Sequence, residues 1–230
     1  MENKVKGLIP PMTDTSSTIS QYTLATPFER LATILLHPAS DSESCSVLRS
    51  DVHFDSHPAR SDFLTAYSHC LARYISYLTV HPEWKTAPGR TLLHAMEWKP
   101  KTAAECSAFS TVLDIVRYVV TKISAMRFRE TEYMIALGLL ERFVVNAKDE
   151  FDLSSSTAAM TILISLITAN KLSSDIPFSN AAYCQHLSIR LLDVFNSEVY
   201  FHKSLHMDLS ISDEQLRDLL KICNCGVKNF

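Results

Sequence analysis

The chain has 230 residues and a net charge of −3, from 22 Lys and Arg against 25 Asp and Glu. Apolar residues make up 47% and charged residues 20%, which is typical of a globular protein and unlike a disordered chain. Only 4 glycines are present, which argues against a glycine-rich nucleotide-binding sheet, and the absence of a lysine- or arginine-rich run argues against nucleic-acid binding. The length predicts one domain with a long extension.

Residues 1–25 are expected to form a flexible arm. They contain two adjacent prolines and many Ser and Thr residues, with too few large apolar side chains to offset the entropy lost on ordering. A short helix is predicted over residues 28–36, because Pro27 suits the first turn of a helix. The polar and acidic residues 38–58 predict an exposed loop.

From residue 61 onward, apolar residues recur at spacings of three and four, which predicts a helix with one apolar face. A Pro at position 82 ends this helix, and a shorter amphipathic piece is expected around Leu92, Leu93 and Met96. Residues 99–101 are interpreted as a linker. Residues 26–106 together are therefore interpreted as an N-terminal helical extension.

The second half of the chain is more regular and predicts three successive helices before residue 172. The first two have apolar faces over residues 112–123 and 133–144, and Gly138 offers a place for close helix contact. The third opens after three serines at 154–156, which are good N-cap residues. Because no charge occurs between Asp152 and Lys171, this helix is expected to be buried on all sides, as the axis of a bundle.

Further helices are predicted near residues 180–186, over 188–205, and from a Ser/Asp cap at 212–213 onward. Residues 211–230 are read as a C-terminal helix and tail. No alternation of useful length indicates a strand. The predicted fold class is therefore all-α.

Lys171 and Glu198 do not fit the packing pattern. Lys171 is the first charge after the buried helix, where a lysine complements the helix dipole. Glu198 interrupts an apolar row formed by Leu187, Leu191, Val194, Phe201 and Leu205. An unpaired carboxylate in such a row would be costly, so Glu198 should find a cation, backbone donors or the edge of the domain. A sharper interpretation places Lys171 and Glu198 close together on a surface that a partner covers.

No leader or membrane span is expected, because the longest weakly polar run, residues 157–169, is shorter than the ~20 residues that a span needs. This favours the cytoplasm or nucleus, where the 6 cysteines would be reduced. Cys223 and Cys225 form a Cys-x-Cys pair, but no second close pair completes a zinc site. We expect no metal and no cofactor.

Three short motifs in the second half occur in a familiar order. Residues 136–144, Ala-Leu-Gly-Leu-Leu-Glu-Arg-Phe-Val, are similar to the Ala…Tyr-Ile-Asp-Arg-Phe-Leu motif of the cyclin box. Residues 167–172, Ile-Thr-Ala-Asn-Lys-Leu, resemble that family's Leu-Ala-Ala-Lys-Tyr, and residues 205–209, Leu-His-Met-Asp-Leu, resemble its Leu-x-Phe-Asp-Leu. The resemblance covers about two-fifths of the chain. It is closest to single-box cyclins of the yeast phosphate-regulon type and their protozoan relatives.

The resemblance implies a five-helix cyclin box over residues 107–210, with the N-terminal helices packed on its outside. It implies a cell-cycle or related regulator without enzymatic activity, which binds and activates a cyclin-dependent protein kinase by positioning its C-helix. Lys171 and Glu198 would be the Lys–Glu pair that holds this helix through its backbone. Leu172, Met207 and Leu209 would be apolar positions of the same interface.

Two other readings remain open. One is a non-catalytic helical adaptor with a cyclin-like fold and no kinase partner. The other is a Cys/His hydrolase that uses Cys184 with His186 or another histidine. Cys184 and His186 are two residues apart, so a helix points them to different faces, and no nucleophile elbow or metalloprotease motif accompanies them.

Overall fold

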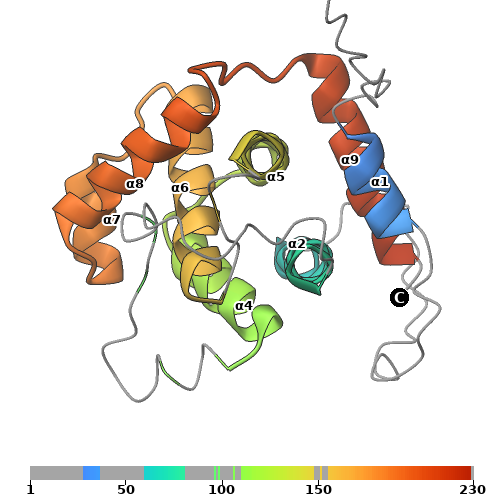
Figure 1. The fold of residues 1–230 in the computed structure, drawn as a ribbon, viewed down its shortest axis with the longest axis horizontal. Helices are drawn as coiled ribbons and strands as arrows, with labels where there is room; N and C mark the ends of the chain where they lie inside the picture. The colour runs from blue at the N-terminus through green and yellow to red at the C-terminus, as the bar shows by residue number, and fades with distance from the viewer. Residues whose placement is uncertain are drawn as a thin grey trace, which may run out of the picture.

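The computed structural model describes residues 28–36, 60–80, 96, 98, 106, 110–147, 151 and 155–228. Within these ranges all regular secondary structure is helical, which confirms the predicted all-α class. The helices, labelled in Figure 1, are α1 (Glu29–Leu36), α2 (Arg60–Val80), α4 (Val112–Ser124), α5 (Glu130–Ala147), α6 (Ser155–Ser173), α7 (Asn180–Leu187), α8 (Leu191–Ser204) and α9 (Asp213–Lys228). The predicted arm at 1–25, the loop at 38–58, the piece around Leu92 and Leu93, and the linker at 99–101 lie outside the described residues.

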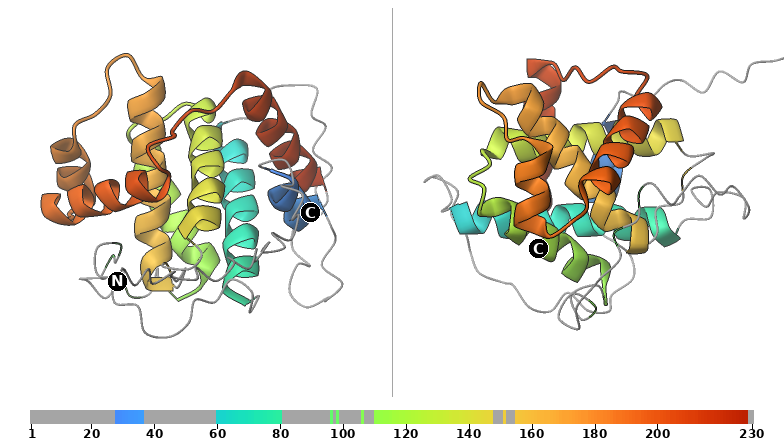
Figure 2. Two further views of the ribbon diagram at one scale, coloured as in Figure 1. Left: turned by 45° about the horizontal axis from the view of Figure 1, so that its top comes forward. Right: turned by 90° about the vertical axis from the view of Figure 1, so that its left-hand side faces the viewer.

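Helix α6 is the buried centre of the fold. Every side chain from Thr157 to Asn170 is buried, which confirms the prediction drawn from the absence of charge. Helices α4, α5 and α8 pack against α6 from different sides (Figure 2). The polar groups inside it are satisfied locally, since Thr161 Oγ1 donates to the Thr157 carbonyl (2.8 Å) and Ser165 Oγ to the Ile162 carbonyl (2.8 Å).

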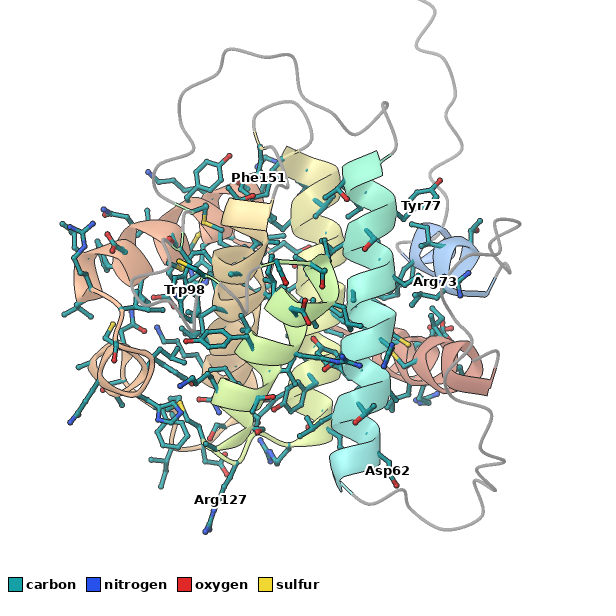
Figure 3. All side chains as sticks on the ribbon, turned by 90° about the horizontal axis from the view of Figure 1, so that it is seen from below. Asp62, Arg73, Tyr77, Trp98, Arg127 and Phe151 are labelled. Carbon is teal, nitrogen blue, oxygen red and sulfur yellow. The ribbon has the colours of Figure 1, made fainter. Side chains whose placement is uncertain are left out.

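Helix α9 packs against α5, α2 packs mainly along α4, and α1 packs against α2 and α9; the apolar side chains of all three join the same core as α4–α6. Tyr67, Leu71 and Ile75 of α2 are fully buried in it. Figure 3 shows Arg73 of α2 pointing toward α1, where its guanidinium donates to the Leu35 carbonyl (3.3 Å). The N-terminal helices therefore share the core of the second half.

Close packing on this side depends on Gly138 of α5. A Cβ atom at this position would lie 2.9 Å from Leu219 Cδ1 of α9 and 3.2 Å from Ile211 Cδ1. A contact below 3.0 Å is essentially never found for a real Cβ, so the end of the Leu219 side chain would have to shift to admit a side chain at position 138. This is the close helix contact expected from the sequence.

The residues that precede α4 and α8 determine where each of these two helices begins. Thr111 caps α4, because its hydroxyl accepts from the Asp114 amide (3.1 Å). The fifth helix of the second half was expected from residue 188, but Ser188 has a left-handed backbone (φ 55°) that ends α7. Helix α8 therefore starts only at Leu191.

Candidate functional site

The structure brings Lys171 and Glu198 together. Lys171 lies in the last turn of α6 and Glu198 in the middle of α8, and Lys171 Nζ is 2.5 Å from Glu198 Oε1. Glu198 is 8% exposed, whereas about a third of the Lys171 side chain remains accessible. Only one of the three ammonium donors is needed for this bond, so the lysine can also donate outward.

The second oxygen of Glu198 is also held. Glu198 Oε2 accepts from Asn180 Nδ2 at the start of α7 (2.8 Å). Burial raises the pKa of the Glu198 carboxyl, but the hydrogen bonds from Lys171 and Asn180 outweigh it, so the net pKa is lowered. Glu198 is therefore ionised at neutral pH and links α6, α7 and α8.

His202 lies one turn beyond Glu198 on α8. Its Nε2 is 3.1 Å from Thr168 Oγ1 of α6. Burial lowers the pKa of His202, the Glu198 carboxylate opposes this shift, and the Lys171 charge adds to it. The ring is therefore neutral at pH 7, and it contributes a polar but uncharged group beside the ion pair.

A buried hydrogen-bond network fixes the end of α6 from which Lys171 projects. Asn170 donates to Glu132 Oε1 of α5 (3.1 Å) and accepts from the Tyr183 hydroxyl of α7 (2.7 Å) and the Phe178 amide (3.2 Å). Glu132 also accepts from the Arg129 amide (2.6 Å). Because these contacts tie three helices to one buried asparagine, the last turn of α6 is held in one orientation.

The segment after α8 is held in a similar way. His206 and Met207 both have left-handed backbone angles, with φ of 52° and 60°, a conformation that is strained for residues other than glycine. Arg142 of α5 donates to the carbonyls of Asp208 (3.0 Å) and Ser210 (2.8 Å). This turn leaves Met207 67% exposed, while Leu209 is only partly buried against the core.

Exposed large apolar side chains occur in the stretch from the end of α6 through α7 and α8 to the turn after α8. Among the residues that the structure describes, every large hydrophobic side chain classed as exposed lies between positions 172 and 207: Leu172, Ile176, Phe178, Leu191, Leu192, Phe195 and Met207. Figures 1 and 2 place these helices opposite α1 and α9. We call these seven side chains together with Lys171 and Glu198 the α6–α8 surface.

The sequence predicts part of this surface. Of the five predicted site residues, Lys171 and Glu198 are in contact, Leu172 and Met207 are exposed, and Leu209 is half-buried. Leu191, predicted in the buried row, is instead 52% exposed in the first turn of α8. Leu192 and Phe195, for which the sequence makes no specific prediction, are exposed as well.

The geometry around Cys184 and His186 does not support the hydrolase interpretation. Cys184 is buried, and burial followed by the nearby Asp193 charge raises the pKa of its thiol, which keeps it protonated. The His186 ring is bonded to the Lys122 carbonyl (2.8 Å). Within the described ranges no group of three or more His, Cys, Asp or Glu side chains could hold a metal ion.

Comparisons with protein-family models, curated proteins and solved structures found no match to this chain. No helix in the described part of the chain combines the length and apolar character needed to cross a membrane.

Proposed function

We propose that this protein is a cyclin-box protein, with α4–α8 as the box, which binds and activates a cyclin-dependent protein kinase. The cyclin-like motifs of the sequence lie on α5, at the end of α6 and just after α8. Five consecutive helices with a buried third helix are compatible with that domain.

The observation that carries the proposal is the Lys171–Glu198 pair at the edge of an exposed apolar surface. A surface that excludes water when covered strengthens the charged hydrogen bonds within it. Lys171, with donors to spare, would bind backbone carbonyls of a docked kinase helix. Glu198 would mainly hold the lysine in place, since both of its oxygens are engaged inside the chain.

Activation of the kinase would follow from the placement of its C-helix. Protein kinases need the glutamate of their C-helix to pair with the strand lysine that orients ATP. A subunit that binds only the active placement of that helix shifts the kinase population by its differential affinity. Leu172 and Met207, both exposed, would supply the apolar contacts around the ion pair.

Binding to a panel of purified cyclin-dependent kinases tests the proposal. Removing one partner of a desolvated charged contact typically weakens binding by about 2–5 kcal/mol, so Lys171→Ala should lower affinity and kinase activation more than tenfold. The matched control is Lys221→Ala, which removes the exposed Lys221–Asp218 ion pair of α9 (3.1 Å). This control should bind normally and melt near the wild-type temperature. Lys171→Ala should remain folded but melt lower than wild type, because the nearly buried Glu198 carboxylate keeps Asn180 as a donor but loses its cation.

A panel in which no kinase binds the wild-type protein would contradict the proposal. So would unchanged binding and activation by a folded Lys171→Ala protein, because the ion pair would then be structural. Either result would leave the non-catalytic helical adaptor as the better reading.

A further inference from the structure

Helices α2 and α9 bring two buried thiols together. Cys70, in the middle of α2, is fully buried, and Cys223 of α9 is 6% exposed. The Cys70 thiol donates to the Cys223 carbonyl (3.8 Å), although 153 positions separate the two residues in the chain. The Lys171–Glu198 pair lies elsewhere, on α6 and α8 (Figure 1), so the proposed kinase binding uses neither cysteine.

The two sulfur atoms also interact with each other. A hydrogen bond with the Cys223 side chain lowers the pKa of Cys70, burial opposes this shift, and the nearby Arg73 charge adds to it. The same hydrogen bond, together with burial, raises the pKa of Cys223 well above its usual value. Cys70 is therefore the thiol that ionises first, and Cys223 keeps its proton beside it. A thiolate next to a second thiol is the arrangement found at redox-sensitive cysteines.

Tyr67 adds a polar group at the same junction between α2 and α9. It lies one turn before Cys70, and its buried hydroxyl has no hydrogen-bond partner among the described residues. Burial first, and then the charges of Cys223, Tyr133 and Cys70, raise the pKa of this hydroxyl, which therefore lies near both sulfur atoms. It can donate a hydrogen bond to an oxygen atom that becomes attached to Cys70.

We propose that Cys70 and Cys223 form a reversible disulfide when the protein meets hydrogen peroxide, and that this bond fixes α9 to α2. The Cys70 thiolate attacks one peroxide oxygen, so an S–O bond forms as the O–O bond breaks. The released hydroxide takes up the proton that Cys70 lost and leaves as water. The Cys223 thiol then loses its proton and attacks the Cys70 sulfur; the S–S bond forms, the S–O bond breaks, and a second water leaves. The two cysteines together lose two electrons, and one peroxide is reduced to two waters.

Local opening of α9 gives the oxidant access to the buried pair. Cys223 lies five residues before the end of α9 at Lys228. Helix ends open more readily than the centre of a fold, so brief separation of these last turns from α2 admits a molecule as small as hydrogen peroxide. When α9 closes again, Cys223 returns to Cys70 and the second step follows.

The disulfide would act on the stability of the fold. It joins residues 153 positions apart, and closing a long loop removes conformational freedom from the unfolded chain. Thiol exchange with reduced glutathione would open the bond again. This inference does not depend on kinase binding, because it concerns the junction of α2 and α9 alone.

Peroxide treatment of the reduced full chain tests the proposal. The remaining thiols are alkylated in denaturant, and peptide mass spectrometry identifies the linked cysteines. A Cys70–Cys223 link should form in the wild type and in Cys106→Ala, which removes an exposed thiol. It should also form in Cys225→Ala, which removes the next cysteine of the chain. Reduced glutathione should reverse it in each case.

Thermal melting measures the effect of the link on the fold. The oxidised wild-type protein should melt about 5–10 °C above the reduced protein, and neither Cys70→Ala nor Cys223→Ala should show this rise. The proposal is overturned if both thiols of the wild type remain open to alkylation after peroxide, if either links to a different cysteine, or if the oxidised and reduced forms melt together. The mapping uses the wild-type chain, so it decides the question even if an alanine variant fails to fold.

Discussion

Helices α8 and α9 lie on opposite sides of the molecule (Figure 1) and present different surfaces to solvent. Helix α9 buries Leu219 and Ile222 against α5 and α2, and its exposed positions include Arg217 and Lys221. This is the ordinary arrangement of an amphipathic surface helix. Among the side chains that the structure describes, α9 leaves no large hydrophobic side chain exposed.

Helix α8 buries Val194 and Phe201 in the core but leaves Leu192 and Phe195 exposed. Exposed apolar patches on a folded protein usually mark an interaction site, whereas isolated apolar residues do not. The contrast with α9 indicates that the exposed apolar surface belongs to one side of the fold and does not reflect a generally small hydrophobic core.

The two sides also hold different ion pairs. Lys171 and Glu198 bridge two helices with the carboxylate nearly buried, whereas Lys221 and Asp218 lie three residues apart on one exposed helix face. Exposed pairs of that kind contribute about 0–1 kcal/mol. Of these two pairs, Lys171–Glu198 is therefore the one positioned to strengthen when a partner excludes water.

The largest expected effect comes from breaking the core that both sides share. Leu163 is fully buried in α6, so Leu163→Asp places an unpaired carboxylate among apolar side chains. We expect loss of several kcal/mol from a total stability of about 5–15 kcal/mol, and hence an unfolded protein. Circular dichroism during heating measures this, and a soluble variant that melts cooperatively would contradict the central position of α6.

The next prediction distinguishes the α9 side of the molecule from the α6–α8 surface. Gly138→Val adds a branched side chain where a Cβ alone would meet Leu219 at 2.9 Å. We expect a loss of about 1–3 kcal/mol from overpacking, measured by urea unfolding, with kinase affinity unchanged. Loss of binding at retained folding would mean that the α9 side takes part in docking.

A smaller effect distinguishes the two ion pairs. Glu198→Ala leaves both Lys171 and Asn180 without their acceptor, and we expect it to lower the free energy of unfolding by about 1–3 kcal/mol. Asp218→Ala, on the exposed α9 pair, should change it by less than about 0.5 kcal/mol. Equal losses in urea unfolding would show that the two pairs have equivalent environments.

The smallest effect is a dependence on pH. The pKa of His202 is lowered from 6.5, first by burial, so its neutral form contributes stability that is fully present above pH 6.5 and lost as the pH falls. The lowered pKa of Glu198 acts in the same direction, with its contribution lost as the pH falls below 4.5. We expect the melting temperature to fall between pH 7 and 5, and His202→Gln to reduce this fall; an identical profile would contradict the burial of the ring.

Much of the fold follows from the sequence because it depends on local periodicity. The sequence shows, in chain order, the apolar faces of α2, α4 and α5 and the charge-free stretch of α6. The helices begin and end close to the positions that capping residues and prolines predict. Lys171 and Glu198 were also noticeable, since each breaks an apolar pattern. In the structure, Lys171 Nζ lies 2.5 Å from Glu198 Oε1, so the buried carboxylate is paired with a cation.

Other features could not be predicted, because they depend on which helices meet. Leu191 belongs to an apolar row with Val194, and only the placement of α7 and α8 decides that one is exposed and the other buried. The Asn170 network joins residues 38 positions apart, so no local spacing reports it. A polar residue at the end of an apolar helix was the available signal for Asn170.

The central claim is that the α6–α8 surface, and not the α9 side, binds a kinase. Oxidative footprinting of side chains tests it most directly in the complex with a purified cyclin-dependent kinase. We expect Met207 and Phe195, both exposed in the free chain, to become protected from oxidation, while Leu216 and Leu220 of α9 remain as reactive as before. Protection of the α9 residues, with Met207 and Phe195 still reactive, would contradict the account.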